Sequence, residues 1–430
     1  MTVLRDKIEE NSATIAVMGL GHVGYPLASL FSNAGFPVIG YDIDRSKVKR
    51  YSEKIVIDGY SVSSNLTATN DPNILKKADI YLITVPTPLS KYDLPDLCFV
   101  VSASETIATT LDRGKLVILV STTYPETTEK IVKPILEKTG LKAGEDFYLC
   151  YCPERFDPGN KTMRIENTPH LVSGINEESR ELAVGLYSKI FGKDNIIPMS
   201  SLKSAEAAKS LENVFRNVNI ALINEMAKIF EKMHIDTWEV IQAASTKPEA
   251  FLAHYPGPGV GGHCIPLDPF YLFYVARKYG IDCRFVQLAG EINKSMPYHV
   301  VFLVGDVLKK KGLSLRGAKV SVLGVTYKEN ISDTRESPAE VIIRELIQEG
   351  ADVYVFDPHT IETFGGKSVK NMEEAIRGKD CVALIVSHNE FKNIEKMINI
   401  TNAKICVIDT RNFIKSELLK KTVTYRCLGK

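Results

Sequence analysis

The sequence lacks several features that would place it in a specialised class of protein. It has no apolar run of the roughly 18 residues that a membrane-spanning helix needs. Its 53 Lys and Arg residues almost balance its 52 Asp and Glu residues, so the net charge of +1 gives no general attraction to nucleic acid or to a membrane surface. The N-terminal residues do not form a secretory signal pattern. These absences predict a soluble, cytoplasmic protein that holds any charged ligand at a local site.

The cysteines also form no framework. Eight of them are scattered along 430 residues without a CxxC pair, which predicts reduced thiols. The pairs Cys150–Cys152 and His263–Cys264 lack the two- to four-residue spacers of tetrahedral zinc sites, so we expect no metal. At about 150 residues per domain, the length predicts two or three domains.

Short runs rich in β-branched residues alternate with helical stretches over the first 200 residues. The runs are apolar at nearly every position, which is typical of parallel strands covered on both faces. This half is therefore expected to form a doubly wound α/β domain. The runs are TIAVMG, PVIGYD, DIYLITVP, LVILVST, DFYLCY and HLVSGI.

The pattern changes in the middle of the chain and then returns. Residues 204–245 have helical apolar spacing without Pro or Gly, which predicts one long helix or two nearly collinear ones. The segment HYPGPGVGGHCIPLDP interrupts the pattern, and KVSVLGV, DVYVFDP, DCVALIVS and KICVIDT again indicate buried strands. We predict an α/β fold in which two Rossmann-like, doubly wound domains are joined by a long central helix, with divisions at 1–203, 204–312 and 313–430.

A glycine motif follows the first strand run. In GLGHVG the first Gly would make a tight turn, the second would let the backbone approach a pyrophosphate, and the third would permit close helix packing. The acid that ends the next strand would bind a ribose and repel a 2′-phosphate, which favours NAD over NADP, although a nearby Arg tolerates that phosphate. The predicted cofactor residues here are Gly19, Gly21, His22, Val23, Gly24, Asp42 and Arg45.

Two later strand ends carry hydroxyl groups. Thr87 and Thr128 follow strands whose carboxyl ends should face the same crevice, where they would contact the cofactor's nicotinamide ribose or diphosphate. The alternative is that Thr and Pro merely terminate these strands.

Cys264 stands apart from the other cysteines because it lies in a glycine-dense loop, between His263 and Asp268. Exposed backbone N–H groups could lower the pKa of its thiol and hold an oxyanion, which would suit a nucleophile. The alternative is a small buried hydrophobic residue, as most free cysteines are.

The predicted long helix carries a polar stripe. Lys209, Asn213 and Arg216 recur at i, i+4 and i+7, opposite Leu211 and Val218. Asn217 and Asn224 follow, although Asn is a poor helix former, so this face is either part of an active site or simply solvated.

Seven segments together resemble the UDP-glucose/GDP-mannose dehydrogenase family, in order and spacing, over residues 13–415. They are GLGHVGYPLA, VPTPLSKYDLPD, STTYPETTEK, CPERFDPGN, AEAAKSLENVFRNVNIALINEMA, PGPGVGGHCIPLDP and LGVTYKENISDTRESP. CPER, GGHCIPLDP and TRESP are similar to the branch that oxidises UDP-N-acetylhexosamines. AASTKPEAF and AGEINKSMP are most similar to UDP-N-acetylglucosamine 6-dehydrogenases, with UDP-N-acetylmannosamine dehydrogenases next.

The resemblance implies a four-electron oxidation of the sugar C6 alcohol to a carboxylate with NAD. Cys264 would add to the aldehyde, and the thiohemiacetal would be oxidised to a thioester. Lys209 would move a proton at the C6 oxygen or stabilise its charge, with a hydrogen bond from Asn213. Asp268 and Glu154 would order the hydrolytic water.

The resemblance also assigns the substrate and partner contacts. The product would serve polysaccharide or glycan precursor synthesis, and the enzyme would form a homodimer or higher homo-oligomer around the long helix, with Arg335 reaching the NAD site of the neighbouring subunit. The residues implied to bind the UDP-sugar are Arg155, Phe156, Arg216, His254, Tyr255, Gly259, Tyr327 and Lys328.

One position departs from the family, which usually has Gly where Glu126 stands. Either this loop bends differently or the side chain points to solvent, and the Thr128 contact is less secure.

Other interpretations stay open: UDP-N-acetylmannosamine or UDP-glucose as substrate, a single-hydride hydroxyacid-type dehydrogenase that needs no thiol, or a non-catalytic nucleotide sensor.

Overall fold

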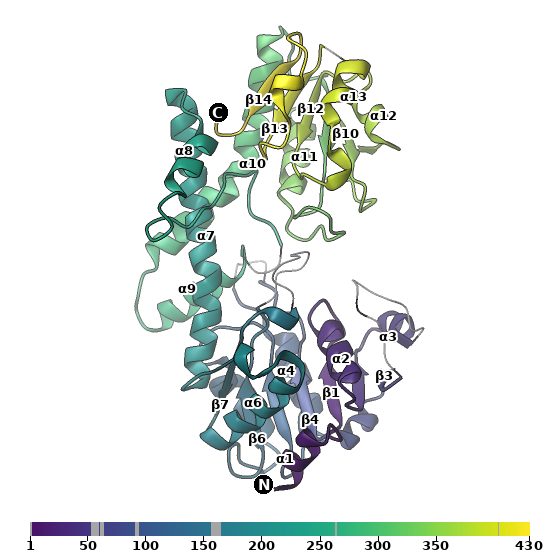
Figure 1. The fold of residues 1–430 in the computed structure, drawn as a ribbon, viewed down its shortest axis with the longest axis vertical. Helices are drawn as coiled ribbons and strands as arrows, with labels where there is room; N and C mark the ends of the chain where they lie inside the picture. Colours follow the sequence, from purple (N-terminus) through teal and green to yellow (C-terminus); the bar gives the residue numbers. More distant parts are fainter. Residues whose placement is uncertain are drawn as a thin grey trace. The chain divides into compact units, whose positions relative to one another are not determined.

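The computed structural model describes residues 2–52, 60, 64–90, 94–155, 165–262, 265–402 and 404–430 (Figure 1). The chain divides into two compact units. The N-terminal unit comprises Met1–Glu212 and Phe270–Ile281, and the C-terminal unit comprises Asn213–Pro269 and Asp282–Lys430. Within the described residues, no helix is long and apolar enough to cross a membrane.

The N-terminal unit is built on an eight-stranded sheet with the order β3-β2-β1-β4-β5-β6-β7-β8. The first six strands run parallel, whereas β7 runs antiparallel to β6. The expectation of a purely parallel sheet was therefore wrong at this edge. The strands are β1 (Ile15–Met18), β2 (Val38–Tyr41), β3 (Leu66–Thr69), β4 (Ile80–Ile83), β5 (Leu116–Leu119), β6 (Tyr148–Tyr151), β7 (His170–Gly174) and β8 (Ile196–Pro198).

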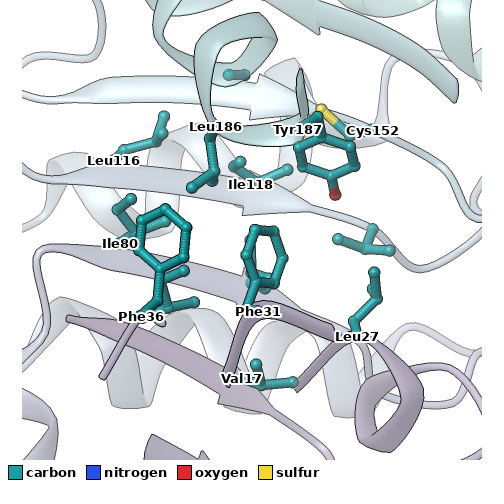
Figure 2. Close-up of a cluster of buried hydrophobic side chains, with 14 of the residues drawn as sticks. Val17, Leu27, Phe31, Phe36, Ile80, Leu116, Ile118, Cys152, Leu186 and Tyr187 are labelled. Carbon is teal, nitrogen blue, oxygen red and sulfur yellow. The ribbon is translucent and has the colours of Figure 1, made fainter. Parts of the chain in front are cut away.

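Helices cover both faces of this sheet, as the continuous apolar strands predicted. Figure 2 shows one face, where Val17, Ile80 and Leu116 of the strands meet side chains of α2 and α6. On the other face, alternate residues of the same strands, such as Met18 and Ile83, pack in a second cluster. The helical elements are α1 (Thr2–Glu9), α2 (Gly24–Asn33), α3 (Arg45–Ser52), η1 (Pro72–Lys77), α4 (Cys98–Ala108), η2 (Thr128–Val132), α5 (Lys133–Glu137), η3 (Ile165–Asn167), α6 (Glu177–Phe191) and η4 (Lys193–Asn195).

The middle of the chain is helical, as predicted. The pattern over 204–245 forms two helices, because His234 has a φ of +58° and the Asp236 side chain caps the second helix by accepting from the Trp238 N–H. The segment between α8 and α9 has no regular structure in its described residues. The helices are α7 (Leu202–Met233), α8 (Thr237–Ala244), α9 (Asp268–Lys278) and α10 (Arg284–Lys310).

The C-terminal unit contains a six-stranded parallel sheet with the order β11-β10-β9-β12-β13-β14. In chain order this is the same 3-2-1-4-5-6 arrangement as the first six strands of the other unit, which is the doubly wound order. The predicted fold class is confirmed. The elements are β9 (Lys319–Leu323), α11 (Pro338–Gln348), β10 (Asp352–Phe356), β11 (Lys367–Ser368), α12 (Met372–Ile376), β12 (Cys381–Leu384), η5 (Asn389–Phe391), α13 (Ile394–Thr401), β13 (Cys406–Asp409), η6 (Ser416–Leu418) and β14 (Thr424–Cys427).

Candidate active site

The glycine motif forms the turn between β1 and α2. Gly19 has a φ of +98°, and a Cβ on Gly24 would lie 1.9 Å from the Gly19 carbonyl oxygen, so the turn requires glycine at both positions. A Cβ on Gly21 would meet nothing within 4 Å. Gly21 therefore presents open backbone at the point where a pyrophosphate would approach. His22 is exposed and Val23 is half-buried within this turn.

Asp42 follows β2 directly, as predicted, and is buried. Its carboxylate accepts the Leu20 N–H at 2.8 Å and the Asp44 N–H at 2.9 Å, and Lys47 Nζ lies 3.5 Å away. A carboxylate offers about four acceptor positions, so capacity remains for a ribose hydroxyl. The glycine turn and the Asp42 carboxylate together fit a dinucleotide, with the turn beside the pyrophosphate and the carboxylate beside a ribose. Arg45 is exposed at the start of α3.

Both predicted threonines use their hydroxyl groups inside the protein. The Thr87 hydroxyl donates to the Thr122 carbonyl at 2.9 Å, and its own carbonyl accepts the Tyr271 hydroxyl from α9. Thr128 is fully buried, and its hydroxyl donates to Glu206 at 2.7 Å. Their contacts with the cofactor stay predictions.

Glu206 is a buried acid that sequence reasoning missed. It lies on α7 and accepts the Glu126 N–H at 2.6 Å and the Thr128 N–H at 2.9 Å, which holds the loop that follows β5. Burial raises the pKa of Glu206 to about 7, although these donors act in the opposite direction. Its signal in the sequence is its position three residues before Lys209, on the same side of the helix.

Glu126 has a backbone conformation that favours glycine. Its φ is +80°, in the left-handed region, and its side chain is held by the Tyr279 hydroxyl at 2.7 Å, Lys130 at 2.6 Å and Lys203 at 3.4 Å. These partners lower the pKa of Glu126 to about 2, with Lys130 as the largest cause. The Glu126 side chain is thus held by a hydroxyl and two lysines, and a different bend of this loop stays a prediction.

Two of the three residues in the polar stripe of α7 are buried, whereas Leu211 of the opposite apolar stripe is exposed. Lys209 is 6% exposed and Asn213 is 4% exposed, whereas Leu211 is 62% exposed. Arg216 is exposed, although the continuous helix places it in one stripe with Lys209 and Asn213, as predicted; its contact with substrate stays a prediction. The buried polar residues Lys209, Asn213 and Asn217 follow one another at intervals of four residues along α7, and Arg216 is not among them.

Two predicted catalytic residues meet in the C-terminal unit. The Asn213 side-chain amide donates to the Asp268 carboxylate, although 55 positions separate them in the sequence. Asp268 is buried at the start of α9. Cys264 and Phe156 lie outside the described residues. Glu154, which is buried, follows β6 and accepts the Arg155 N–H at 2.8 Å.

The glycines of the loop serve close packing against the segment that follows β9. A Cβ on Gly261 would lie 2.7 Å from the Tyr327 Cβ, and one on Gly262 would lie 2.8 Å from the Tyr327 ring. The Gly262 N–H donates to the Arg335 carbonyl at 3.1 Å. The loop therefore meets the predicted substrate residue Tyr327, and its glycines have a packing role; the exposure of N–H groups to the thiol stays a prediction.

The other predicted substrate residues lie as follows. Arg155 forms a bidentate ion pair with Glu212, at 2.5 and 3.2 Å. Arg335, which was predicted to reach the NAD site of a neighbouring subunit, pairs its guanidinium with Asp333, and that NAD contact stays a prediction. In the loop, Gly259 has a φ of +136°, while the exposed Tyr255 stacks on Trp238 with ring centroids 5.4 Å apart. His254 and Lys328 are half-buried.

Arg411 is a cation that sequence reasoning missed. It follows β13, donates its Nε–H to the Ile385 carbonyl at 2.9 Å, and would place Nη1 3.0 Å from a Cβ on Gly257. Arg411 is a cation three residues after Ile408, the last apolar residue of the predicted strand KICVIDT. This position lies at the carboxyl end of the strand, where ligands bind on such sheets, and that is its signal in the sequence.

Three possible metal ligands lie together at the ends of β10 and β12. Nitrogen and oxygen atoms of His359, His388 and Glu390 lie within 4.8 Å of one another. Both ring nitrogens of His388 are already used, because one accepts the Asn330 N–H at 2.9 Å and the other contacts Asp357 at 3.0 Å. This arrangement favours a hydrogen-bonded His–Asp pair.

Three family models match successive parts of the chain. They are the NAD binding domain (residues 13–191), the central domain (residues 203–295) and the UDP binding domain (residues 321–416) of the UDP-glucose/GDP-mannose dehydrogenase family.

Individual relatives match over almost their whole length. A UDP-N-acetyl-D-mannosamine dehydrogenase from Methanocaldococcus jannaschii is 36% identical, with 96% of each chain covered. A UDP-N-acetyl-D-glucosamine 6-dehydrogenase from Pseudomonas aeruginosa is 38% identical, covering 88% of this chain and 92% of that protein. The solved UDP-N-acetyl-D-mannosamine dehydrogenase of Pyrococcus horikoshii is 34% identical, with a TM-score of 0.87 over 97% of this chain and 99% of that one.

The resemblance stated from the sequence motifs is thereby confirmed, and the glycine turn and Asp42 lie within residues 13–191, which match the family's NAD binding domain. The chain belongs to the UDP-glucose/GDP-mannose dehydrogenase family and is an NAD-dependent nucleotide-sugar 6-dehydrogenase.

Proposed function

We propose that this enzyme oxidises C6 of a UDP-N-acetylhexosamine to the carboxylate in two steps, through a thioester on Cys264. The observation that carries the proposal is the hydrogen bond from Asn213 to Asp268, since it joins the polar face of α7 to the residue four positions after Cys264. The sequence motifs favour UDP-N-acetylglucosamine. The mannosamine epimer is the second candidate, because relatives of both names match the chain.

The residues divide the chemistry as follows. NAD, when bound, accepts one hydride from C6 in each oxidation. Lys209 takes up the proton of the C6 hydroxyl as the aldehyde forms, and the Cys264 sulfur then adds to C6 while a proton returns to the C6 oxygen. The second oxidation removes the remaining C6 hydrogen as hydride and the hydroxyl proton, leaving the thioester.

Hydrolysis completes the cycle. Asp268 and Glu154 orient a water molecule, whose oxygen bonds to C6 as the C–S bond breaks and the thiol is restored. The overall reaction consumes one alcohol, two NAD⁺ and one water, and yields one carboxylate, two NADH and three protons. Asn213 donates a hydrogen bond to the C6 oxygen when substrate displaces Asp268 from its amide.

The nucleotide end of the substrate requires cations, because the whole chain supplies almost no net positive field. Lys328 and Arg411 are candidates for the diphosphate, and the packing of Tyr327 on the glycine loop supports a substrate position beside that loop. A three-part division at 1–203, 204–312 and 313–430, a role in glycan precursor synthesis and a cytoplasmic location remain predictions.

We also propose that the enzyme is a homodimer, with the exposed apolar stripe of α7 covered by the same stripe of a second copy. Five residues at helical spacing form the stripe, which suits a self-complementary two-fold contact. They are Leu211, Phe215, Leu222, Ile229 and Met233. The Leu222→Glu variant should sediment as a monomer, while Ile361→Glu, at a position 98% exposed in a loop, should not. Equal masses for both variants would contradict the proposal.

The central experiment measures NADH formed per sugar consumed, by absorbance, with each epimer of UDP-N-acetylhexosamine. We expect about two NADH, and a Cys264→Ala variant that fails to produce uronic acid, since only a trapped aldehyde explains both. Cys98→Ala, which removes an exposed thiol, is the matched control. One NADH per sugar with an active Cys264→Ala variant would establish a single-hydride enzyme, and turnover of one epimer alone names the substrate.

A further inference from the structure

The loop that carries Cys264 is attached to α7 at two points by buried side-chain amides. At the first point, Asn224 is fully buried and its Oδ1 accepts the Gly257 N–H at 3.0 Å. Its Nδ2 donates to Asn293 Oδ1 of α10 at 2.9 Å, and Asn293 Nδ2 donates to the Asn217 carbonyl at 3.0 Å. The Gly257 end of the loop is thus fixed by two helices through one amide chain.

The second point lies on the other side of Cys264. Asn217 is 3% exposed, and its Nδ2 donates to the Ile265 carbonyl at 3.1 Å. Ile265 directly follows Cys264 in the sequence, so this bond holds the Ile265–Pro266 peptide, one residue after the proposed nucleophile.

The spacing of the two points explains why amides are needed. Asn217 and Asn224 are seven residues apart on α7, which corresponds to about 10 Å along the helix axis. The eight steps from Gly257 to Ile265 could span about 26 Å if extended. The loop must fold back over a short distance without a strand or helix in its described part, and the amides provide the partners that its backbone groups require.

We propose that Asn217 and Asn224 are separate positioning residues for the two ends of this loop, an inference that rests on the proposed function. Asn224, supported by Asn293, sets the end that includes the predicted substrate residues Tyr255 and Gly259. Asn217 sets the end next to the thiol. Loss of the Asn224 amide therefore affects substrate binding, and loss of the Asn217 amide affects the chemical steps.

The test compares Asn217→Ala and Asn224→Ala with Asn219→Ala. Asn219 is the matched control, because its amide donates to the Phe215 carbonyl of its own helix at 2.7 Å. We expect Asn217→Ala to lower kcat about tenfold with KM changed less than twofold. Asn224→Ala should raise KM for the UDP-sugar about tenfold with a smaller change in kcat, and Asn219→Ala should change neither by more than twofold.

A second readout does not depend on turnover. The rate at which iodoacetamide alkylates Cys264 in the folded full-length protein, followed by mass spectrometry of the peptide that contains Cys264, should change at least threefold in Asn217→Ala and not in Asn219→Ala. If the unmodified protein oxidises neither epimer, the proposed function fails, and the alkylation rates still decide the positioning role.

The outcomes that overturn the proposal are equally defined. Equal loss of kcat and gain in KM in both variants would show a merely structural role, as would an alkylation rate of Cys264 that stays within twofold. Circular dichroism and NADH binding report whether each variant folds. If Asn217→Ala does not, Asn217→Asp keeps the side-chain size but cannot donate to Ile265, and the same kcat and alkylation criteria apply.

Discussion

Replacement of Glu206 by Gln should remove a pH dependence of stability that is specific to the N-terminal unit. Glu206 is fully buried and holds the loop after β5 through the N–H groups of Glu126 and Thr128. Burial raises its pKa to about 7, against an ordinary value of 4.5. The folded protein therefore binds this proton more tightly than the unfolded chain does.

The sign and size of the effect follow from that difference. The contribution of Glu206 is fully present below pH 4.5 and is lost as the pH rises through 7, because the buried carboxyl must then ionise. At 1.36 kcal/mol per pKa unit, the loss is about 3 kcal/mol. Glu206→Gln has no such loss, but its amide cannot accept from all three donors, which costs about 1–3 kcal/mol at every pH.

Hydrogen exchange measured at pH 5, 6, 7 and 8, corrected for intrinsic rates, is the assay, because the Glu126 and Thr128 amides are direct reporters. Urea unfolding followed by circular dichroism gives the global comparison. The opening free energy should fall with pH in the unmodified protein and stay level in Glu206→Gln. If the opening free energy changed with pH in the same way in the unmodified protein and in Glu206→Gln, the reasoning would be refuted, since Glu206 would then not titrate in this range.

Three further predictions concern glycine positions. Gly24→Ala should lower the Tm and abolish NADH binding measured by fluorescence, because its Cβ would clash with the turn. Gly21→Ala has space for its Cβ and should only weaken NADH binding. Equal losses of Tm in the two variants would contradict this packing. Glu126→Gly should have a Tm about 2 °C above that of Glu126→Ala, because φ is positive there, and identical calorimetric Tm values would rule out backbone strain. Gly261→Ala should cost about 1–3 kcal/mol through its clash with Tyr327, and an unchanged urea midpoint would show that the loop yields.

The central strands of both sheets could be predicted from the sequence, because a strand buried on two faces must be apolar at every position. Ile80–Ile83 and Leu116–Leu119 are examples, with all four residues buried in each. The four edge strands β3, β8, β11 and β14 were not predicted, since an edge strand is covered less and needs fewer apolar residues. In β11 both residues, Lys367 and Ser368, are exposed. The reversal of β7 likewise leaves no mark in composition.

The site was predictable where a residue type carries its own chemical meaning. The glycine turn and Asp42 have fixed spacing and neighbouring strands, so their arrangement followed from the local pattern. Glu206 and Arg411 could not be found in that way, because their partners belong to segments that are distant in the sequence. Which face of α7 is buried was also ambiguous. Amphipathic spacing shows that a helix has a polar side and an apolar side. It does not show that the polar side is the buried one, as it is here, because its residues have buried hydrogen-bond partners.

The division of the chain into units has a consequence for the order of synthesis. Residues 270–281 belong to the N-terminal unit, although 57 residues of the other unit, Asn213–Pro269, precede them. Tyr271 and Val275 in this segment complete a small core with Tyr124. A ribosome must therefore extend the chain past residue 281 before the first unit can close this core. Neither unit corresponds to a continuous stretch that could be expressed as an intact half.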